Sequence, residues 1–222
     1  MLIDDIDKQF KLLNHEQPSE LVALDLTGDK SKFIGQGWAK DAGEAEDWAD
    51  DVESRFPTAS LYIGVTDRTE EFVAQAMATD KVIRGGKGSI AAVTCIVLDI
   101  DPIRDEGSRS MATNEQRENA HDAAVVVQEI LRKDGYQEGH LFDSGNGIAL
   151  YLPIPRLEVR DHPDIDRKVG RFMQDLRIKL DKLAPGLAKI DATFDLPRLT
   201  RLAGTVNRKG SDQTKWRTSS WI

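Results

Sequence analysis

The sequence predicts an α+β fold, in which helices cover a β-sheet and an N-terminal α/β portion packs beside it. Over residues 90–191 the apolar pattern changes in the order strand, helix, hairpin, helix, strand. The chain has 222 residues, of which 40% are hydrophobic and 31% are charged. That composition is enough for one good core or two small ones, and it excludes disordered and collagen-like classes.

The N-terminal part predicts a helix, a strand and a second helix. The helix spans 41–56, ends before Pro57, and has one apolar face formed by Ala45, Trp48, Ala49 and Val52. Residues 60–65, SLYIGV, are typical of a strand. A weaker helical pattern covers 70–78 and leads into the glycine-rich connection RGGKGS.

A central strand is predicted over 91–102, because AAVTCIVLDIDP is a β-branched apolar run that ends in two aspartates and a proline. Thr113 and Gln116 then have the spacing of a capping box. The helix that they begin ends at Gly135, and its apolar face is formed by Ala120, Ala123, Ala124, Val127, Ile130 and Leu131.

A β-hairpin is predicted next, because the apolar runs at 140–143 and 148–153 flank an Asn-Gly pair within residues 144–147. A further amphipathic helix covers 164–183 and ends at a Pro-Gly pair. A short strand then ends at Asp191, and a basic, loop-rich stretch follows it. We find no linker that would divide the chain cleanly.

The composition indicates the net charge of the protein and its expected cellular location. The net charge is −8 and the pI is about 5.1, which argues against a protein that coats nucleic acid by charge alone. The tail is nevertheless basic, so a site for a polyanion is expected there. No apolar run is long enough to span a membrane, and the acidic start is unlike a secretory signal. We expect a cytoplasmic protein with no membrane partner, in which the single Cys95 packs in the core.

Two aspartates at the end of the central strand are the first candidate site. Asp99 and Asp101 lie two residues apart, so their side chains point the same way and suit a hard cation such as Mg²⁺ or Mn²⁺. Asp191, at the end of another apolar run, is a candidate third ligand. A solvated loop start for the pair, and a turn or N-cap for Asp191, are the simpler interpretations.

Two further groups have the chemistry of anion binding. The first group comprises Ser144, Gly145, Asn146 and Gly147. Its glycines let backbone amides approach an anion, although a hairpin turn needs the same residues without a ligand. The second group comprises Arg198, Arg201, Asn207, Arg208 and Lys209. Its cationic side chains could hold a triphosphate or a nucleic-acid backbone, although a solvated basic face has the same composition.

The order of these motifs is more specific than any one of them. VLDIDPIR, a long helix, DSGNGIALYLPIP and IDATFDLPRLTRLAGTVNRKG follow one another, and the set resembles the archaeo-eukaryotic primase superfamily over residues 60–217. The most similar members are the primase-polymerase domains of phages, plasmids and CRISPR-associated systems. The resemblance implies an N-terminal αβ unit at 1–88 and a catalytic module like an RNA-recognition motif at 89–222, together forming one compact domain.

The resemblance also implies roles for the candidate residues. Asp99, Asp101 and Asp191 match the carboxylates that hold two Mg²⁺ or Mn²⁺ ions. The group at 144–147 matches the motif that faces the phosphates of the incoming nucleotide, and nucleotide or template contacts fall on Arg198, Arg201, Asn207 and Lys209. The implied activity is a DNA primase or polymerase of a mobile genetic element. It would use dNTPs or NTPs, single-stranded DNA template and primer, with a helicase or accessory domain in the full-length protein.

One position departs from the family pattern. The second motif normally has a phosphate-binding histidine two residues after SGNG, and this chain has Ala149 there. The missing charge-assisted contact is worth about 1.5–3 kcal/mol. Three explanations of the alanine are open: a natural variant that uses Lys209 or an arginine instead, a degenerate domain that binds nucleotide without polymerising, or an engineered inactivating change. A metal-dependent phosphodiesterase is a third functional class that the carboxylates alone would allow.

Overall fold

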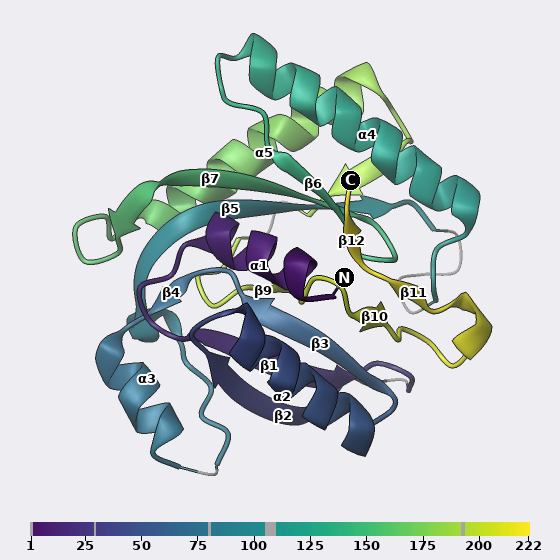
Figure 1. The fold of residues 1–222 in the computed structure, drawn as a ribbon. Coiled ribbons are helices and arrows are strands. Elements are labelled where there is room, and N and C mark those ends of the chain that lie inside the picture. Colours follow the sequence, from purple (N-terminus) through teal and green to yellow (C-terminus); the bar gives the residue numbers. More distant parts are fainter. Residues whose placement is uncertain (1, 29, 80, 105–109, 192–193) are drawn as a thin grey trace.

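The computed structural model describes residues 2–28, 30–79, 81–104, 110–191 and 194–222, and within them it contains two main sheets (Figure 1). The smaller sheet is antiparallel, and its strands lie in the order β2 (Lys32–Ala39), β1 (Ser19–Asp25), β3 (Ala59–Gly64) and β9 (Leu199–Arg201). The larger sheet has the order β12 (Ser220–Trp221), β6 (His140–Asp143), β7 (Ile148–Glu158), β5 (Ile90–Pro102) and β4 (Asp67–Arg68), with β8 (Ala188–Ile190) paired to β5.

The helices and the remaining strands surround these sheets. The helices are α1 (Leu2–Leu13), α2 (Ala42–Arg55), α3 (Glu70–Met77), α4 (Asn114–Lys133) and α5 (Ile165–Leu183). Two short strands, β10 (Val206–Asn207) and β11 (Arg217–Thr218), pair with each other. The predicted α+β class is confirmed, and so are the predicted helices at 41–56, 70–78 and 164–183 and the helix that begins after Thr113.

The long strand β5 separates two hydrophobic cores, because alternate side chains of a strand point to opposite faces. Ile96, Leu98 and Ile100 belong to a core that α4 and α5 cover. Cys95 and Val97 belong to the other core, which α1, α2 and the smaller sheet share. Burial raises the pKa of the Cys95 thiol to about 12, so its predicted packing role is confirmed.

The capping residues form as the sequence predicts. The Thr113 hydroxyl accepts from the backbone N–H of Gln116, whose side chain accepts from the backbone N–H of Thr113. At the start of α2 the Asp41 carboxylate accepts from the backbone N–H of Glu44. Gly135 follows α4 with a φ of +83°, a conformation that glycine adopts without steric cost.

The N-terminal helix α1 and the strands β1 and β2 were not predicted. α1 packs against α2 and lies on β5 and β7, and Ile6 and Leu13 are fully buried there (Figure 1). Its Gln9 amide donates to the Tyr151 hydroxyl at 2.7 Å and to the Arg201 carbonyl at 2.8 Å. The helix therefore connects β7 of the larger sheet to β9 of the smaller one.

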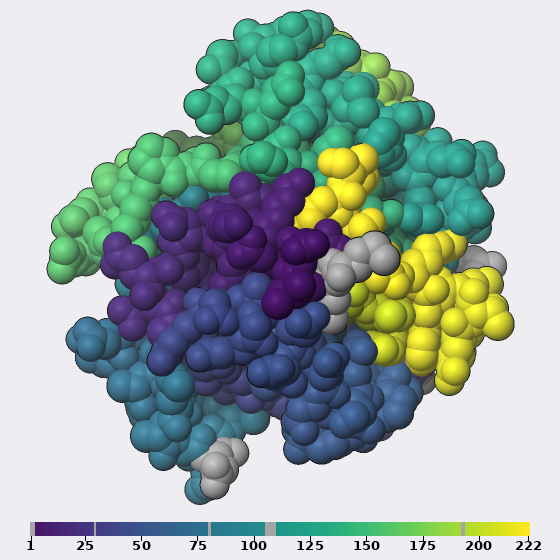
Figure 2. Space-filling model, viewed as in Figure 1, coloured from purple at the N-terminus to yellow at the C-terminus, as the bar shows by residue number. Residues whose placement is uncertain are grey.

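The two ends of the chain pack together. Figure 2 shows C-terminal residues, in yellow, between the purple N-terminal part and the teal region of α4. The Trp221 indole N–H donates to the Asp5 carbonyl at 2.9 Å, and its ring contacts Phe142 and Tyr151 at centroid distances of 4.9 and 5.0 Å. Among the described helices, none combines the length and apolar character that a bilayer crossing requires.

The predicted division at residue 88 stays a prediction, but chain segments on both sides of it share one sheet. β9, from the C-terminal part, pairs with β3 through Tyr62 and Arg201 and through Ile63 and Thr200. This pairing brings the basic stretch that begins at Arg198 between the two sheets.

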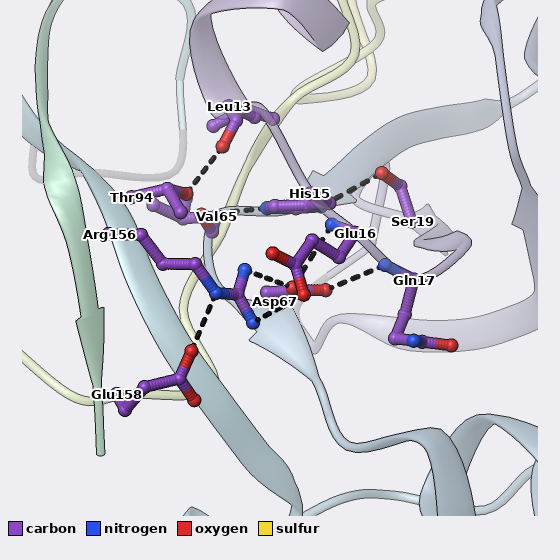
Figure 3. Close-up of polar contacts among 10 residues, drawn as sticks. All are labelled: Leu13, His15, Glu16, Gln17, Ser19, Val65, Asp67, Thr94, Arg156 and Glu158. Carbon is purple, nitrogen blue, oxygen red and sulfur yellow. Dashed lines mark hydrogen bonds and ion pairs between the residues drawn. The ribbon is translucent and has the colours of Figure 1, made fainter. Parts of the chain in front are cut away.

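A polar cluster joins the loop after α1 to β4 and β7 (Figure 3). The carboxylate of Asp67 is fully buried and accepts from the Arg156 guanidinium at 2.6 Å. It also accepts from the backbone N–H groups of Glu16 and Gln17 at 3.1 and 3.2 Å. Glu158 accepts from the same arginine at 2.7 Å. The Asp67 carboxylate thus fixes the loop after α1 to the larger sheet.

His15 belongs to this cluster and gives the fold a pH dependence. Its Nε2 lies 3.1 Å from the Val65 carbonyl, which can only accept, so in the neutral ring Nδ1 accepts from the Ser19 hydroxyl at 2.8 Å. Loss of water around the ring lowers the pKa of His15 below its ordinary 6.5, and the neighbouring arginines add to this effect.

We expect the free energy of unfolding to fall as the pH drops below about 6.5, because the unfolded chain then binds a proton that the folded chain resists. Urea unfolding from pH 7.5 to 5.5 measures this. His15→Gln should flatten the slope in that window, whereas His121→Gln, on the surface of α4, should leave it unchanged. Equal slopes in the wild type and His15→Gln would contradict this account.

Candidate active site

The three predicted carboxylates meet where β5 and β8 end. Asp99 and Asp101 lie near the C-terminal end of β5. Their side chains are on the same face of the strand as Cys95 and Val97 and therefore face the smaller sheet. Asp191 directly follows β8, and its backbone N–H donates to the Asp99 carbonyl at 2.9 Å. Strand pairing thus brings together Asp99 and Asp191, which are 92 positions apart in the sequence.

An arginine from the basic stretch lies between two of the carboxylates. Nη2 of Arg198 is 2.6 Å from Oδ2 of Asp99 and 3.4 Å from Oδ2 of Asp191. Its side chain is only 8% exposed, whereas that of Asp99 is 40% exposed. Asp101 faces another buried arginine, Arg104, at 3.7 Å. The site therefore alternates acidic and basic groups, with the acids on the solvent side.

The carboxylates share one electrostatic field. Loss of solvation raises the pKa of the Asp99 carboxyl, and the negative charges of Asp101 and Asp191 raise it further. The positive charge and the hydrogen bond of Arg198 lower it. Mutual repulsion of this kind favours the approach of a positive group.

The donor set of this site fits a hard divalent cation, because all three acids supply carboxylate oxygens. Among the described residues, however, no group of three or more His, Cys, Asp or Glu side chains is already arranged around a metal position. Asp99 and Asp191 instead pair with Arg198. A cation at this site would therefore compete with the guanidinium for the same oxygens.

The predicted glycine-rich turn closes the hairpin between β6 and β7. The Ser144 hydroxyl donates to the Gly147 carbonyl at 2.9 Å and accepts from the Gly147 N–H at 3.2 Å. Gly145 has a φ of +81°, and its N–H donates to the Asp143 carboxylate at 2.7 Å. The Ser144 side chain is thus used within the turn, which is the simpler of the two roles that the sequence allowed.

Two asparagines hold this turn in place. The Asn146 carbonyl oxygen accepts from the backbone N–H of Ala112 at 2.7 Å, which ties the turn to the start of α4. The Asn207 amide donates to the Ser144 carbonyl at 2.9 Å, and its own Oδ1 is buried and has no hydrogen-bond partner among the described residues. An orphaned acceptor beside the turn is unusual in a folded protein.

The turn directly contacts the carboxylate end of β5 through Gly147. A Cβ on Gly147 would lie 2.9 Å from the Ile100 carbonyl oxygen, 3.2 Å from Pro102 Cδ and 3.5 Å from the Asp101 carboxylate. The first of these atoms is backbone and cannot turn aside. Glycine is therefore needed here for the close approach of two strands.

We expect Gly147→Ala to displace the end of β5 and to lower any activity that depends on Asp101 by at least about tenfold, because small displacements of reacting groups are costly. Gly170→Ala, in the open part of α5, is the matched control and should raise the melting temperature slightly. Steady-state rates and thermal melts of both variants measure this. Unchanged activity in Gly147→Ala would show that Asp101 is not at the reacting centre.

A cationic group lies next to the carboxylates. The pKa of Lys209 is lowered by burial and by the charges of Arg104 and Arg201, while Asp101 opposes the shift. Arg201 is 5% exposed and donates to the Tyr62 hydroxyl at 2.9 Å. Burial also lowers the pKa of Arg201. The positive charges of neighbouring residues disfavour the charged forms of Lys209 and Arg201, and an anion bound beside them would relieve this repulsion.

Other basic residues of the tail have structural partners. Arg208 pairs with Glu53 of α2 at 2.6 Å and donates to the Ala59 carbonyl at 2.7 Å. Arg217 donates to the Ala112 carbonyl at 3.0 Å. The polyanion site expected in the basic tail is therefore narrower than the whole stretch. Arg198 contacts Asp99 and Asp191, and Lys209 lies close enough to Asp101 to interact with its charge, whereas Arg201 contacts Tyr62.

Ala149 lies directly opposite Asp99 in the β5–β7 ladder, and its exposed fraction is 1%. Its other neighbour across the sheet is Phe142 of β6. A longer side chain at 149 would stand beside the Asp99 carboxylate, on the same face of the sheet. The departure from the family pattern thus falls inside the candidate site.

Arg104 is the site residue that the sequence did not reveal. It follows Asp101 by three positions in a segment without helix or strand periodicity, so no pattern placed its side chain. Tyr62 was seen only as part of a strand, and its contact with Arg201 depends on the pairing of β3 with β9. The contact of Tyr62 with Arg201 thus arises from strand pairing, whereas that of Arg104 with Asp101 is local in the sequence.

No family model matches the sequence. No curated protein matches it either.

Solved structures do match. The crystal structure of primase RepB' superposes with a TM-score of 0.53 at 12% identity, covering 100% of this chain and 56% of that one. The polymerase domain from Mycobacterium tuberculosis ligase D in complex with DNA gives a TM-score of 0.50 at 12% identity, covering 94% and 76%. The catalytic domain of primase RepB' in complex with initiator DNA gives 0.48 at 10%, covering 99% and 83%.

The first two of these likenesses identify the fold. The chain shares the fold of these primase and polymerase domains, as the sequence predicts. It spans little more than half the length of the primase RepB' chain.

Proposed function

We propose that this protein is a template-directed nucleotidyltransferase that makes or extends primers on single-stranded DNA. The observation that carries the proposal is the convergence of Asp99, Asp101 and Asp191 beside Arg198 and Lys209. Nucleotidyl transfer needs both signs of charge at one place, since the triphosphate is an anion and the metals that activate it bind carboxylates. The two solved polymerase and primase structures supply the fold for this chemistry.

Each residue has a role in this proposal. Asp99, Asp101 and Asp191 would hold Mg²⁺ or Mn²⁺, with Arg198 exchanging its carboxylate partners for the nucleotide phosphates. Divalent cations, when bound, supply positive charge to the attacking oxygen and to the leaving pyrophosphate. Lys209 and Arg201 would neutralise the triphosphate.

The turn at 144–147 has a positioning part in the proposal. Gly147 keeps the end of β5 and the turn in contact, and Asn146 and Asn207 fix the turn to its neighbours. The buried Oδ1 of Asn207 is left to accept a hydrogen bond, and a nucleotide hydroxyl is a donor of the required kind.

The experiment that tests the proposal is incorporation of labelled nucleotides on single-stranded DNA, with and without a primer. We expect product in Mg²⁺ or Mn²⁺ and none after chelation with EDTA. Product in the unprimed reaction would establish priming as well as extension. Release of nucleoside monophosphates from the DNA, without incorporation, would instead indicate a phosphodiesterase.

A second candidate function is a binding module that holds nucleotide and primer-template without turnover. Ala149 favours it, because a residue without a donor lies opposite Asp99. Nucleotide binding without incorporation in the assay above would support this candidate.

The variant Ala149→His separates the two candidates. We expect incorporation to rise about tenfold or more, because a charge-assisted contact is worth about 1.5–3 kcal/mol. Stability should fall by about 1–3 kcal/mol, since the site is fully packed. Ala123→His, in the other core, is the control for overpacking and should lose stability without a gain in incorporation. A folded Ala149→His with unchanged incorporation would mean that another group already fills the role.

A further inference from the structure

A cavity lies beside β2, the edge strand of the smaller sheet at the end opposite β9 (Figure 1). Its volume is about 470 Å³. Residues of β2 line one side of it, and residues of α3 and of the segment that follows α3 line the other. None of the candidate active-site residues lines this cavity, and none of the motifs found in the sequence includes it.

One edge of β2 is free. The strand pairs with β1 over residues 32–39, and no other strand in the described part of the chain pairs with it. Alternate backbone N–H and C=O groups of β2 therefore point away from β1 without a ladder partner. The strand has eight residues and no proline, the residue that commonly protects such an edge. An edge of this kind can accept an extended peptide as an additional strand.

Contacts between β2 and the opposite wall hold the cavity open. The Gln36 amide donates to the Ile83 carbonyl at 3.1 Å, and its own oxygen accepts from the Ile83 N–H at 3.2 Å. The Trp38 ring packs edge-on against Phe72 of α3 at a centroid distance of 6.0 Å. A Cβ on Gly35 would meet no described atom within 4 Å, so there is open space beside this part of β2. The cavity therefore exists before any ligand binds.

The lining of the cavity combines apolar side chains with one cation. Met77 and Val82 are apolar but are 55% and 45% exposed, and Trp38 lines the cavity with them. Lys81 is the only charged residue of the lining, and it has no ion-pair partner among the described residues. Arg84, three positions further on, is also exposed and without an ion pair there. A ligand that complements this cavity carries both an apolar group and a negative charge.

A peptide fits these features better than a nucleic acid does. The free edge of β2 needs a partner whose N–H and C=O groups repeat with the spacing of a strand, and a nucleic-acid backbone has no such groups. The helix α2, which packs against β2, carries several acidic residues and a single arginine, and this charge disfavours a dense polyanion. An isolated carboxylate beside Lys81 meets much less of this repulsion than a row of phosphates would.

We propose that the free edge of β2 binds an extended acidic segment of a partner protein, which adds a fifth strand to the smaller sheet. The backbone of the segment pairs with β2, an apolar side chain enters the cavity beside Met77 and Val82, and an acidic side chain pairs with Lys81. The inference concerns attachment to another protein, so it does not rest on the proposed nucleotidyl transfer.

The test is the affinity of the full chain for three fluorescein-labelled octapeptides, measured by anisotropy. In the first, glutamate and isoleucine alternate along one face of the extended peptide, and threonine fills the other face. The second has lysines in place of the glutamates, and the third has prolines in place of the threonines. We expect the first to bind with a Kd below about 100 µM. The other two should bind at least about tenfold more weakly, because the second has the wrong charge and the third lacks backbone donors.

Lys81→Glu reverses the charge of the cavity. We expect it to weaken binding of the glutamate peptide at least about tenfold and to strengthen binding of the lysine peptide by a similar factor. The matched control is Lys182→Glu, because Lys182 is an exposed lysine of α5 that also has no ion-pair partner among the described residues. Lys182→Glu should leave both affinities unchanged, and thermal melts confirm that each variant is folded.

Hydrogen exchange reports whether the bound peptide forms a strand. Saturation with the glutamate peptide should slow the exchange of alternate backbone amides of β2 at least about tenfold, because these amides become ladder donors. The amides of β12, the edge strand of the larger sheet, should exchange at the same rate with and without the peptide.

Four results would overturn the proposal. They are no binding of the glutamate peptide at about 1 mM, equal losses in Lys81→Glu and Lys182→Glu, binding without protection of β2, and a loss of oligothymidine affinity in Lys81→Glu as large as its loss of peptide affinity. The last result would assign the cation to nucleic acid. Nucleotide incorporation should be equal in Lys81→Glu and the wild type. If neither incorporates nucleotide but the peptide binds as expected, the β2 site stands and the proposed function fails.

Discussion

Asp99→Asn is expected to lower nucleotide incorporation by at least about 1,000-fold while the protein remains folded. The metal charge that this carboxylate would hold is worth several kcal/mol in the transition state, and each 1.36 kcal/mol is a factor of ten. Asparagine keeps the size of the side chain. It also relieves the repulsion from Asp101 and Asp191 that helps to raise the pKa of Asp99, and Arg198 keeps Asp191 as an acidic partner.

The control for this variant is Asp122→Asn, because Asp122 is exposed on α4, far along the chain from the strand ends. Single-turnover rates, thermal melts and nucleotide affinity are measured for both. We expect nucleotide affinity to change much less than the rate in Asp99→Asn, since Lys209 and Arg201 remain. Full activity of Asp99→Asn in Mg²⁺ would remove this carboxylate from the mechanism.

Asp67→Ala is expected to lower the free energy of unfolding by about 3–5 kcal/mol, the usual loss when one partner of a buried ion pair is removed. Asp67 is fully buried and is the acceptor for Arg156 and for two backbone N–H groups of the loop after α1 (Figure 3). Its removal leaves these three donors to find new partners. Urea unfolding followed by tryptophan fluorescence measures the loss.

Asp122→Ala serves as the surface control and should change stability by less than about 0.5 kcal/mol. The double variant Asp67→Ala/Arg156→Ala should lose less than the sum of the two single losses, because each single change leaves the other partner uncompensated. A loss below about 1 kcal/mol for Asp67→Ala would mean that water replaces the carboxylate and that the cluster does not hold the loop.

The predictable parts of the fold are those in which the local pattern and the tertiary structure agree. β5 was found because its apolar run is buried on both faces, and α4 because its capping box and its periodic face coincide. α1 was not predicted: its acidic start, Asp4 and Asp5, argues against a secretory signal but does not by itself indicate a helix. β1 and β2 carry neither an Asn-Gly turn nor regular alternation, so nothing local marked them.

The site divides in the same way. The spacing of Asp99 and Asp101 predicts their common direction, since a strand repeats every two residues. That Asp191 joins them depends on β8 pairing with β5, a contact that no local pattern specifies. The positions of Arg104 and Tyr62, and the burial of Ala149 opposite Asp99, follow from packing and strand register. The sequence thus predicts which residue types form the site, whereas most of their contacts depend on tertiary structure.

The most direct test of the central claim is template-directed incorporation on homopolymer templates. The protein is given primed poly(dT), poly(dA) or poly(dC) in Mn²⁺ with one labelled nucleotide at a time, and pyrophosphate is measured alongside. The account predicts that only the complementary nucleotide is added, with one pyrophosphate released for each addition. Addition that ignores the template, or DNA breakdown without pyrophosphate, would contradict a template-directed nucleotidyltransferase.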